Sequence, residues 1–415
     1  MKHKLTKIMA CLLAAVLMFS AVPVTEVNLG GLFIIAGAAE TEGIFTYESN
    51  YDSATITKCD NTVTGEVVIP ATLGGKQVKY IGEKAFEWCD KMTSVVVPEG
   101  VTNIQSDAFL NCIDLESITI PGSLSYINVS AFETCKKLKK VYISDLAAWC
   151  NGFGSYRCPF SGFDLYLNGE LLTEVIIPDS VTKIGNYAFA DCKSIVNVTI
   201  PESVTTIGDC AFYGCKNLDG VILPDSVTTI GDSTFSYCEN LTDIEIPNSV
   251  TSIEDSVFYK CSKLAEVEIP DSVTSIGSSV FSDCSSLTNI TIPGSISQIA
   301  DYSFYNCSGL ESVVIEEGVK GIGSYAFSDC TSLKSVAIPN SLRSVLGYAF
   351  YGCKSLDGIV LPDSVTSIGS SAFRGCSSLT NITIPGSISQ IANDSFYGCS
   401  SLETVIIEEG VEEIG

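Results

Sequence analysis

The chain has 415 residues, of which 46% are hydrophobic, and its 48 acidic residues outnumber 23 basic ones, so the formal net charge is −25. This balance excludes nucleic acid as a partner, because such binding depends on Lys and Arg neutralising phosphates. The only histidine, His3, lies in a segment that we expect to be cleaved off. The mature chain then lacks the groups for Ser-His-Asp or Cys-His catalysis and for the usual zinc sites, and we expect no enzyme activity, metal or cofactor.

An export signal is predicted at the amino terminus. In MKHKLTKIMACLLAAVLMFSAV, three lysines precede an apolar run that is shorter than the roughly 20 residues of a membrane-spanning helix. A second apolar stretch ends in the small residues Ala36–Ala38, so we predict a signal peptide over residues 1–38 and no membrane insertion after its removal. A retained anchor, or lipidation at Cys11, is the alternative.

Residues 40–70 are predicted to form an N-terminal β cap. The stretches IFTY, ATIT and EVVIP are typical of short strands, and Asn, Asp and Gly residues between them favour turns. No such cap is apparent at the other end, where the chain stops at Gly415 in the middle of a repeat. We therefore expect either that the chain is a fragment or that a further domain follows this residue.

A 23-residue period runs through residues 71–415. It is marked by the motif AF or a near variant, whose phenylalanines lie 23 residues apart except between Phe132 and Phe189, where the step is 57, or 23 plus 34. Such a period predicts a solenoid, in which each repeat forms one coil and stacks on its neighbours. The motif phenylalanines are Phe86, Phe109, Phe132, Phe189, Phe212, Phe235, Phe258, Phe281, Phe304, Phe327, Phe350, Phe373 and Phe396.

Whole coils are duplicated within this array. The stretch CSSLTNITIPGSISQIA occupies Cys284–Ala300 and, unchanged, Cys376–Ala392, an offset of 92 residues or four units of 23. Adding complete coils extends a common core without changing its register.

One unit, LTNITIPGSISQIADYSFYNCSG from Leu287, supplies the numbering of positions 1 to 23. The pattern L-x-x-I-x-I predicts a short strand, and the proline at position 7 ends it because proline has no N–H to donate. A second short strand is predicted where Val227–Ile230 lies, and a single helical turn at S/D-x-A-F-x-x-C. The predicted fold class is a repeat solenoid with a parallel β-sheet, short second strands and single helical turns.

Thirteen of the 18 cysteines occupy position 21. Export permits disulfides, and the coil spacing of about 4.8 Å is within reach of a bridge. Alternate bridging would leave a doubled period, however, and none is seen, so we favour a column of buried free thiols. Cys150 and Cys158 lie outside the column, and a bridge between them stays open.

The pattern L-x-x-I-x-I-P-x-S-V-T-x-I-G-x-x-A-F-x-x-C-x-x resembles the 23-residue leucine-rich repeat of the BspA-like family of bacterial surface proteins over roughly residues 63–415. The resemblance implies a leucine-rich repeat fold and a secreted or cell-surface protein. It also implies adhesion to host matrix proteins or other cells, with ligands bound on the face of the parallel sheet.

Position 5 is predicted to point outward on that face and gives the candidate ligand face. Apolar residues in an outward row suggest a binding surface, although β-propensity alone is the alternative explanation. The candidate ligand residues are Tyr142, Ile176, Thr199, Ile222, Glu245, Glu268, Thr291 and Val314, within a row that also contains Val96, Thr119, Ala337, Val360, Thr383 and Ile406.

Positions 3 and 5 of two successive coils are all acidic: Asp243 and Glu245, then Glu266 and Glu268. We expect these four side chains to cluster. A cation or a basic partner suits such an acidic patch, and a solvated surface without function is the simpler alternative.

The long coil, residues 144–172, interrupts the array. A short helix is predicted at Asp145–Cys150, and Asn168-Gly169 predicts a hairpin turn. An interrupting loop is a frequent site of specificity, although its aromatic residues can instead pack a local core. The candidate insertion-loop residues are Trp149, Phe153, Tyr156 and Phe160.

The sequence therefore predicts an exported, surface-associated, non-catalytic protein that binds an extracellular protein or glycan ligand. The alternative is the targeting or spacer region of a larger secreted enzyme whose catalytic domain lies beyond residue 415. The sequence leaves the ligand and the oligomeric state undefined.

Overall fold

A computed structural model describes residues 27–29, 32–34, 39–154 and 157–415. Strands β1 (Val27–Leu29) and β2 (Leu32–Ile34) form an antiparallel pair, while the rest of the predicted signal peptide, with the cleavage site at Ala36–Ala38, lies outside the described residues. The signal peptide stays a prediction. Among the described residues, no helix has the length and apolar character needed to cross a membrane.

The N-terminal segment forms short strands that join both faces of the array. Strands β3, β4 and β5 form an antiparallel meander, β5 then pairs in parallel with β8, and β6 pairs in parallel with β9. Strand β7 pairs antiparallel with β8. The bounds of these strands are β3 (Glu40–Glu42), β4 (Phe45–Ser49), β5 (Ser53–Cys59), β6 (Gly65–Val68), β7 (Thr72–Leu73), β8 (Lys76–Ile81) and β9 (Met92–Val96).

Each coil begins with the predicted first strand. Neighbouring first strands pair in parallel with partners 23 residues apart, as in Thr199↔Ile222, and where position 7 holds proline the strand ends before it. These strands are β11 (Ser117–Ile120), β13 (Lys140–Ile143), β14 (Asp164–Leu167), β16 (Glu174–Ile176), β18 (Asn197–Thr199), β20 (Gly220–Ile222), β22 (Asp243–Glu245), β24 (Glu266–Glu268), β26 (Asn289–Ile292), β28 (Ser312–Ile315), β30 (Ser335–Ala337), β32 (Gly358–Ile359), β34 (Asn381–Ile384) and β36 (Thr404–Ile407).

The predicted second strands are present as two-residue ladders on another side of the solenoid. In most of them, one side chain points into the core and its neighbour outward, as in Thr229 and the buried Ile230. They are β10 (Asn103–Ile104), β12 (Tyr126–Ile127), β17 (Lys183–Ile184), β19 (Thr206–Ile207), β21 (Thr229–Ile230), β23 (Ser252–Ile253), β25 (Ser275–Ile276), β27 (Gln298–Ile299), β29 (Gly321–Ile322), β31 (Ser344–Val345), β33 (Ser367–Ile368), β35 (Gln390–Ile391) and β37 (Glu413–Ile414).

The predicted helical turn in each coil is wrong. Positions 15–21, which we call the turn ribbon, form consecutive tight turns, as where Ser282 N–H donates to the Ser279 carbonyl and Cys284 N–H to that of Phe281. Positions 16 and 20 have positive φ, as at Ser279 (58°) and Asp283 (62°), which a right-handed helix cannot contain. This geometry turns the N–H groups at positions 16, 18 and 20 toward carbonyls of the next coil, so the ribbon is a third ladder between coils.

The core is one continuous column of stacked side chains. The motif phenylalanines of neighbouring coils stack with ring centroids 4.8–5.8 Å apart, including 5.6 Å for Phe212–Phe235 and 5.8 Å for Phe235–Phe258. The same coils bury the leucine at position 1 and the branched residues at positions 4, 10 and 13. The predicted parallel β-solenoid is thus confirmed.

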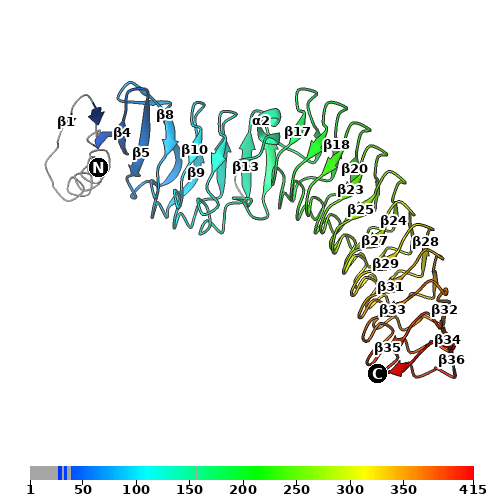
Figure 1. Cartoon of the computed structure of the whole chain (residues 1–415). Helices are drawn as coiled ribbons and strands as arrows, with labels where there is room; N and C mark the ends of the chain where they lie inside the picture. Colours follow the sequence, from blue (N-terminus) through cyan, green and yellow to red (C-terminus); the bar gives the residue numbers. More distant parts are fainter. Residues whose placement is uncertain (1–26, 30–31, 35–38, 155–156) are drawn as a thin grey trace.

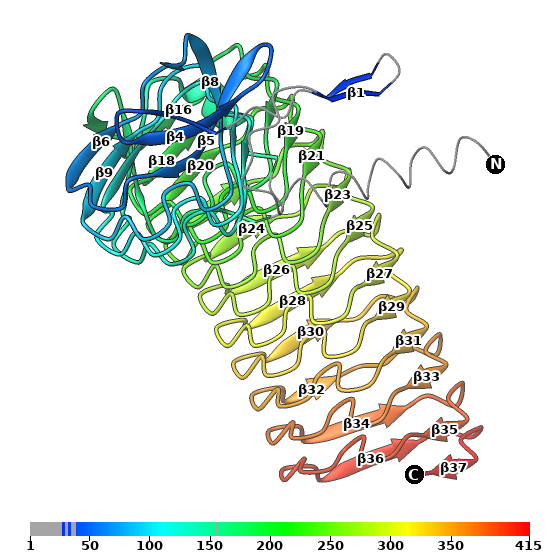
Figure 2. The same cartoon turned by 90° about the vertical axis from the view of Figure 1, so that its left-hand side faces the viewer.

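The array has two arms. Figure 1 shows the coils from β4 to α2 in a nearly straight row, after which the chain bends near β17 and descends to β36. Figure 2 shows the lower arm side-on, with the first strands from β24 to β36 stacked one below another and the second strands at the adjacent edge. The bend follows the long coil, which holds the helix α2 (Leu146–Cys150) and the hairpin of β14 with β15 (Glu170–Leu171).

Candidate functional site

The outward residues at position 5 form a continuous row, which we call the strand face. Strand register places Thr199 between Ile176 and Ile222, and Thr291 beside Val314. The burial pattern alternates as expected, with the central residue of each strand buried and its neighbours outward. The predicted arrangement of these side chains is therefore present, while their role in binding stays a prediction.

Large aliphatic side chains on the strand face are open to solvent. Ile176 is 71% exposed, Ile222 66% and Val360 82%, and Val314 and Ile406 are also exposed. Several large aliphatic side chains exposed along one face of a monomer mark an interaction surface more often than a single scattered residue does.

The sequence analysis missed two members of this row. Val68 of the cap is exposed and pairs with Val96. Tyr166 on β14 pairs with Tyr142, and their rings lie 4.7 Å apart. Both were hidden because they lie outside the 23-residue spacing, one before the first repeat and one inside the long coil.

The four acidic residues do lie together. Asp243 pairs with Glu266 and Glu245 with Glu268 across neighbouring strands, and all four are exposed. Across the part of the chain that the structure describes, no group of three or more His, Cys, Asp or Glu residues is arranged to hold a metal ion. The patch therefore gives no support to a bound cation.

The aromatic residues of the long coil pack a local core. Trp149, Phe153 and Phe160 are all buried, and the Phe160 ring stacks on Phe132 with ring centroids 5.4 Å apart, so it extends the phenylalanine column into the long coil. Of the two alternatives for these aromatic residues, the described ones follow the packing of a local core, and a role in ligand contact has no support from their exposure. Tyr156 lies outside the described residues.

The local elements of the long coil are as predicted. The helix α2 begins after Asp145, whose carboxylate accepts a hydrogen bond from Ala148 N–H at 2.9 Å. The hairpin turn at Asn168-Gly169 has positive φ at both residues, 53° and 89°, the geometry that Asn-Gly favours.

The position-21 cysteines are free thiols, as are all cysteines among the described residues, including Cys150 and Cys158. In eleven coils the thiol donates to the phenylalanine carbonyl of the preceding coil at 3.0–3.2 Å, as Cys261 does to Phe235. Burial raises the pKa of the column thiols from Cys192 to Cys399, for example that of Cys192 to about 11. These thiols therefore stay protonated at neutral pH and act as small core residues.

A model of the BspA type leucine-rich repeat region, six copies long, matches residues 61–154, 164–284, 228–357 and 322–415. The chain belongs to the BspA-type leucine-rich repeat family. No curated protein matches the chain significantly.

Several solved structures are similar to this BspA-type chain. A leucine-rich repeat protein from Bacteroides ovatus is 30% identical, with 88% of this chain and 94% of that one covered and a TM-score of 0.60. A leucine-rich cell surface protein from Faecalibacterium prausnitzii is 28% identical, with coverage of 89% and 95% and a TM-score of 0.51. A leucine-rich repeat protein from Eubacterium ventriosum is 26% identical, with coverage of 81% and 93% and a TM-score of 0.51.

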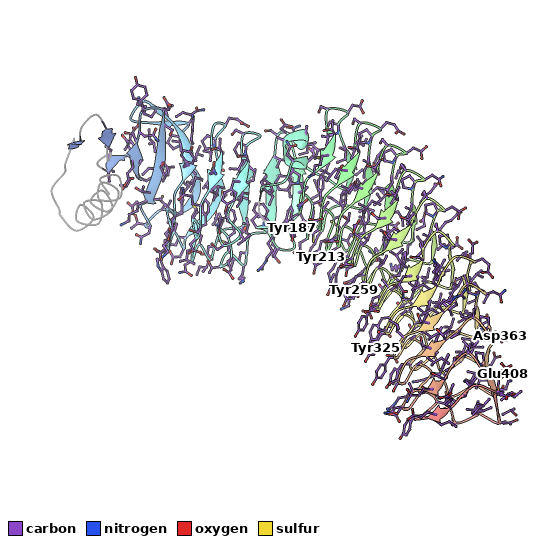
Figure 3. All side chains as sticks on the ribbon, viewed as in Figure 1. Tyr187, Tyr213, Tyr259, Tyr325, Asp363 and Glu408 are labelled. Atoms are coloured by element: carbon purple, nitrogen blue, oxygen red, sulfur yellow. The ribbon has the colours of Figure 1, made fainter. Side chains whose placement is uncertain are left out.

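The BspA-type array carries a second outward row that the sequence analysis missed, the tyrosine row. Ten of the 17 tyrosines occupy positions 16, 19 or 20 of the turn ribbon, a bias that the sequence alone would have shown. Tyr302, Tyr325 and Tyr348 stack at 4.8 and 4.6 Å, and Figure 3 shows Tyr187, Tyr213, Tyr259 and Tyr325 along the inner side of the bend. The ten are Tyr187, Tyr213, Tyr237, Tyr259, Tyr302, Tyr305, Tyr325, Tyr348, Tyr351 and Tyr397.

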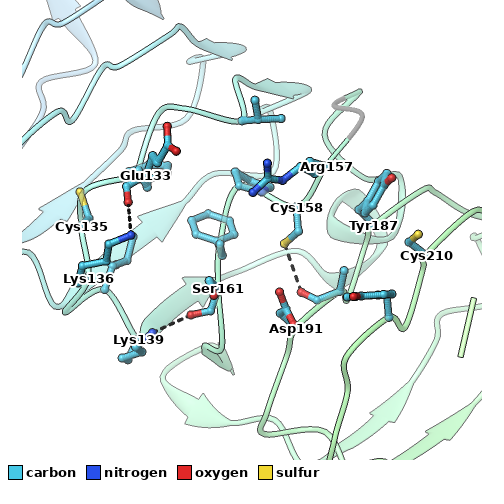
Figure 4. Close-up of a pocket in the computed structure, with 17 residues that line it drawn as sticks. Glu133, Cys135, Lys136, Lys139, Arg157, Cys158, Ser161, Tyr187, Asp191 and Cys210 are labelled. Atoms are coloured by element: carbon cyan, nitrogen blue, oxygen red, sulfur yellow. Dashed lines mark hydrogen bonds between the residues drawn. The ribbon is translucent and has the colours of Figure 1, made fainter. Parts of the chain in front are cut away.

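A hollow of about 660 Å³ lies where the turn ribbon is interrupted, between the coil of Phe132 and the coil of Phe189. Its walls carry Lys136, Lys139 and Arg157 (Figure 4). Four aromatic rings, two carboxylates and three thiols complete most of the lining. These are Phe132, Phe160, Tyr187, Tyr213, Glu133, Asp191, Cys135, Cys158 and Cys210. The volume falls in the range of small-ligand pockets.

Burial raises the pKa of two ionisable side chains that line the hollow. Desolvation raises the pKa of Asp191, and the positive charges of Lys193, Lys216 and Lys139 oppose that rise. Burial also raises the pKa of Tyr187 to about 12. Both shifts show that water reaches these groups only in part.

Proposed function

We propose that this BspA-type protein is exported to the cell surface and binds an extracellular protein through its strand face, without catalysing a reaction. The observation that carries the proposal is the set of exposed aliphatic side chains on the strand face, which includes Ile176, Ile222 and Val360. A partner that covers these side chains removes their apolar surface from water, which favours binding.

The chemistry of the strip favours a protein ligand over a glycan. Isoleucine and valine offer no hydrogen-bonding groups for sugar hydroxyls, whereas the central part of a protein–protein interface is apolar and surrounded by polar residues. On the strand face, the segment from Ile176 to Ile222 is apolar at two of its three outward positions and is bordered on one side by the acidic pair Glu245 and Glu268.

The surface location is supported by similarity. The alignment with this chain covers 95% of the Faecalibacterium prausnitzii protein, and that protein is described as a cell surface protein. The apolar and basic amino terminus fits the export signal that this location requires.

The test compares two charge insertions. The double substitution Ile176→Glu and Ile222→Glu places carboxylates in the strip, and Ile113→Glu is the control, because Ile113 is also exposed (53%) but lies outside the strand face. Binding of the purified chain to a panel of immobilised extracellular matrix proteins and glycans is measured by surface plasmon resonance.

We expect at least one protein ligand, with affinity that falls about tenfold or more in the double variant and stays unchanged in Ile113→Glu. Circular dichroism confirms that both variants fold. Binding to glycans alone, or equal binding by the double variant and the wild type, would show that the strand face is not a protein-binding surface.

A further inference from the structure

Tyrosine recurs in every second coil at position 19 of the turn ribbon. Five tyrosines occupy this position, each 46 residues, or two units of 23, from the next, and the coils between them carry serine or arginine. The period at this position is therefore twice that of the fold, which requires no such alternation. The tyrosines are Tyr213, Tyr259, Tyr305, Tyr351 and Tyr397, and the residues between them are Ser236, Ser282, Ser328 and Arg374.

Packing between neighbouring coils does not impose this alternation. At position 16, three successive coils carry Tyr302, Tyr325 and Tyr348, and their rings stack nearly parallel, with interplanar angles of 4° and 3°. Tyrosines in adjacent coils therefore fit side by side in the ribbon. At position 19, the intervening Ser282 and Ser328 are buried, so the tyrosines provide the accessible surface there.

The spacing of two coils matches one turn of a polyproline II helix. The ring centroids of Tyr302, Tyr325 and Tyr348 are 4.8 and 4.6 Å apart, so two coils extend about 9.4 Å, against about 9.3 Å for the three residues of a polyproline II turn. Side chains on one side of a β-strand repeat about every 6.8 Å, and those on one face of an α-helix about every 5.4 Å. Of these conformations, only polyproline II brings each successive turn into register with Tyr305 and Tyr351.

Carboxylates beside these tyrosines indicate the charge of a ligand. Desolvation raises the pKa of Tyr305, and the negative charges of Asp329 and Asp283 add to this rise, so both carboxylates lie near its hydroxyl group. The four ion pairs of the described chain involve other acidic residues. Asp283 and Asp329 are therefore available to pair with basic groups of a ligand.

The basic residues of the ribbon in the lower arm are already engaged. The amino group of Lys260 lies over the rings of Tyr237 and Tyr259, 5.0 and 5.1 Å from their centroids, and Arg374 forms an ion pair with Asp394. The ribbons of the four coils between Lys260 and Arg374 contain no lysine or arginine. This stretch of the ribbon therefore presents acidic and aromatic side chains together.

We propose that the turn ribbon of the lower arm binds a proline-rich segment of another extracellular protein in the polyproline II conformation. Prolines three residues apart pack on Tyr305 and Tyr351, as they do on other aromatic surfaces that recognise such segments. The segment has no internal hydrogen bonds, so its carbonyls accept from the hydroxyl groups of the position-16 tyrosines. Its basic side chains pair with Asp283 and Asp329.

A sugar ligand fits this surface less well. Sugar rings pack on the open faces of aromatic side chains, whereas Tyr325 has its two faces covered by Tyr302 and Tyr348. The surface is also separate from the strand face, because the ribbon and the first strands form different ladders between coils. Loss of binding at one surface therefore does not imply loss at the other.

The experiment measures binding of fluorescein-labelled peptides to the purified chain by fluorescence anisotropy. The probe repeats Pro-Ser-Arg, a Pro-Ser-Gln peptide removes the charge, and an Ala-Ser-Arg peptide removes the proline rings. Labelled cellohexaose tests the sugar alternative.

Three protein variants locate the site, and circular dichroism confirms that each folds. The double substitution Tyr305→Ser and Tyr351→Ser removes two rings and leaves serine, which other coils carry at this position. Asp329→Asn removes one charge and keeps a residue that tolerates positive φ, as Asn306 does at the same position (56°). Tyr51→Ser is the control, because Tyr51 is 88% exposed and lies in the N-terminal segment.

We expect the Pro-Ser-Arg peptide to bind, with affinity about tenfold or more lower in the double variant and unchanged in Tyr51→Ser. Asp329→Asn should weaken binding of Pro-Ser-Arg but not of Pro-Ser-Gln, and Ala-Ser-Arg should bind more weakly than Pro-Ser-Arg. The proposal would be overturned by no binding of Pro-Ser-Arg, by its unchanged affinity for the folded double variant or for Asp329→Asn, or by an equal loss in Tyr51→Ser. Undiminished binding of Ala-Ser-Arg, or binding of cellohexaose alone, would also overturn it.

Discussion

At the scale of single residues, the cysteine column shows how much a repeat period reveals. The sequence predicted the column and favoured free thiols, and the described cysteines are free. It could not predict the bond from each thiol to the phenylalanine carbonyl of the preceding coil, as from Cys284 to Phe258 at 3.2 Å, because that bond joins residues 26 apart through the geometry of stacking. This bond explains the cysteine at position 21. An apolar side chain there could not donate to the phenylalanine carbonyl, which would then have one hydrogen-bond partner fewer.

The buried thiols predict loss of stability in alkali. The column cysteines from Cys192 to Cys399 have pKa values raised by burial, whereas thiols of the unfolded chain ionise near 8.5. The contribution of the protonated thiols to the free energy of unfolding is therefore fully present below about pH 8.5. It falls as the pH rises toward the pKa values of the folded state, by up to about 1.4 kcal/mol per thiol and pH unit.

Guanidinium unfolding under reducing conditions at pH 7.5 and 9.5 measures this effect, and the midpoint should be clearly lower at pH 9.5. The variant Cys261→Ala removes one thiol, so it should be less stable at pH 7.5 but show a smaller dependence on pH. An identical midpoint at both pH values would contradict the linkage.

At the scale of elements, both short strands followed from the sequence, since alternating branched residues and the proline at position 7 fix their place. The turn ribbon did not, because S/D-x-A-F-x-x-C has the length of a helical turn. The signal that was available is chemical: several position-20 residues are Gly, Asn or Asp, such as Gly214 and Asn306, the types that tolerate positive φ. Position 16, with Tyr302 and Tyr325, gives no such signal.

Ser279 tests the left-handed geometry of the ribbon, since its φ is 58°. Glycine adopts this conformation without strain, so Ser279→Gly should stabilise the array by about 0.5–1 kcal/mol, after allowance for the larger backbone entropy of glycine. A β-branched residue is strongly disfavoured there, and Ser279→Val should destabilise by at least about 1 kcal/mol.

The neighbouring Ser278, whose φ is not positive, is the matched control. Its replacement by glycine should destabilise slightly, opposite in sign to the change at Ser279, in urea unfolding followed by circular dichroism. Equal effects of valine at the two positions would rule out a left-handed residue at Ser279.

At the scale of the whole molecule, the solenoid and its phenylalanine column were predictable, because a repeat that cannot bury its own apolar side must stack. The bend was not predictable. The 57-residue step located the interruption, but the fate of its aromatic rings depended on packing, which placed Phe160 in the column and left the hollow beside it. The outward rows could be predicted from the period, whereas the hollow could not, because the long coil does not follow the 23-residue spacing.

Removal of one complete coil should leave the fold intact. Deletion of Leu287–Gly309 joins Ser286 to Leu310 and restores the same sequence pattern, and each coil contacts only its neighbours, so the stability should fall modestly. Deletion of Leu287–Ser297 removes less chain but breaks the register, and it should unfold or aggregate the protein. Thermal unfolding followed by circular dichroism compares the two, and a complete-coil deletion as damaging as the partial one would contradict independent stacking.

The duplicated stretch has a consequence for avidity. Because Cys284–Ala300 and Cys376–Ala392 are identical and their strands β26 and β34 occupy the same place in their coils, the lower arm shows the same small epitope twice. The two copies are four coils apart, about 19 Å at the spacing of paired strands. A partner with two matching motifs on a linker that spans this distance would bind the second copy intramolecularly, so the array would hold repetitive ligands more tightly than single ones.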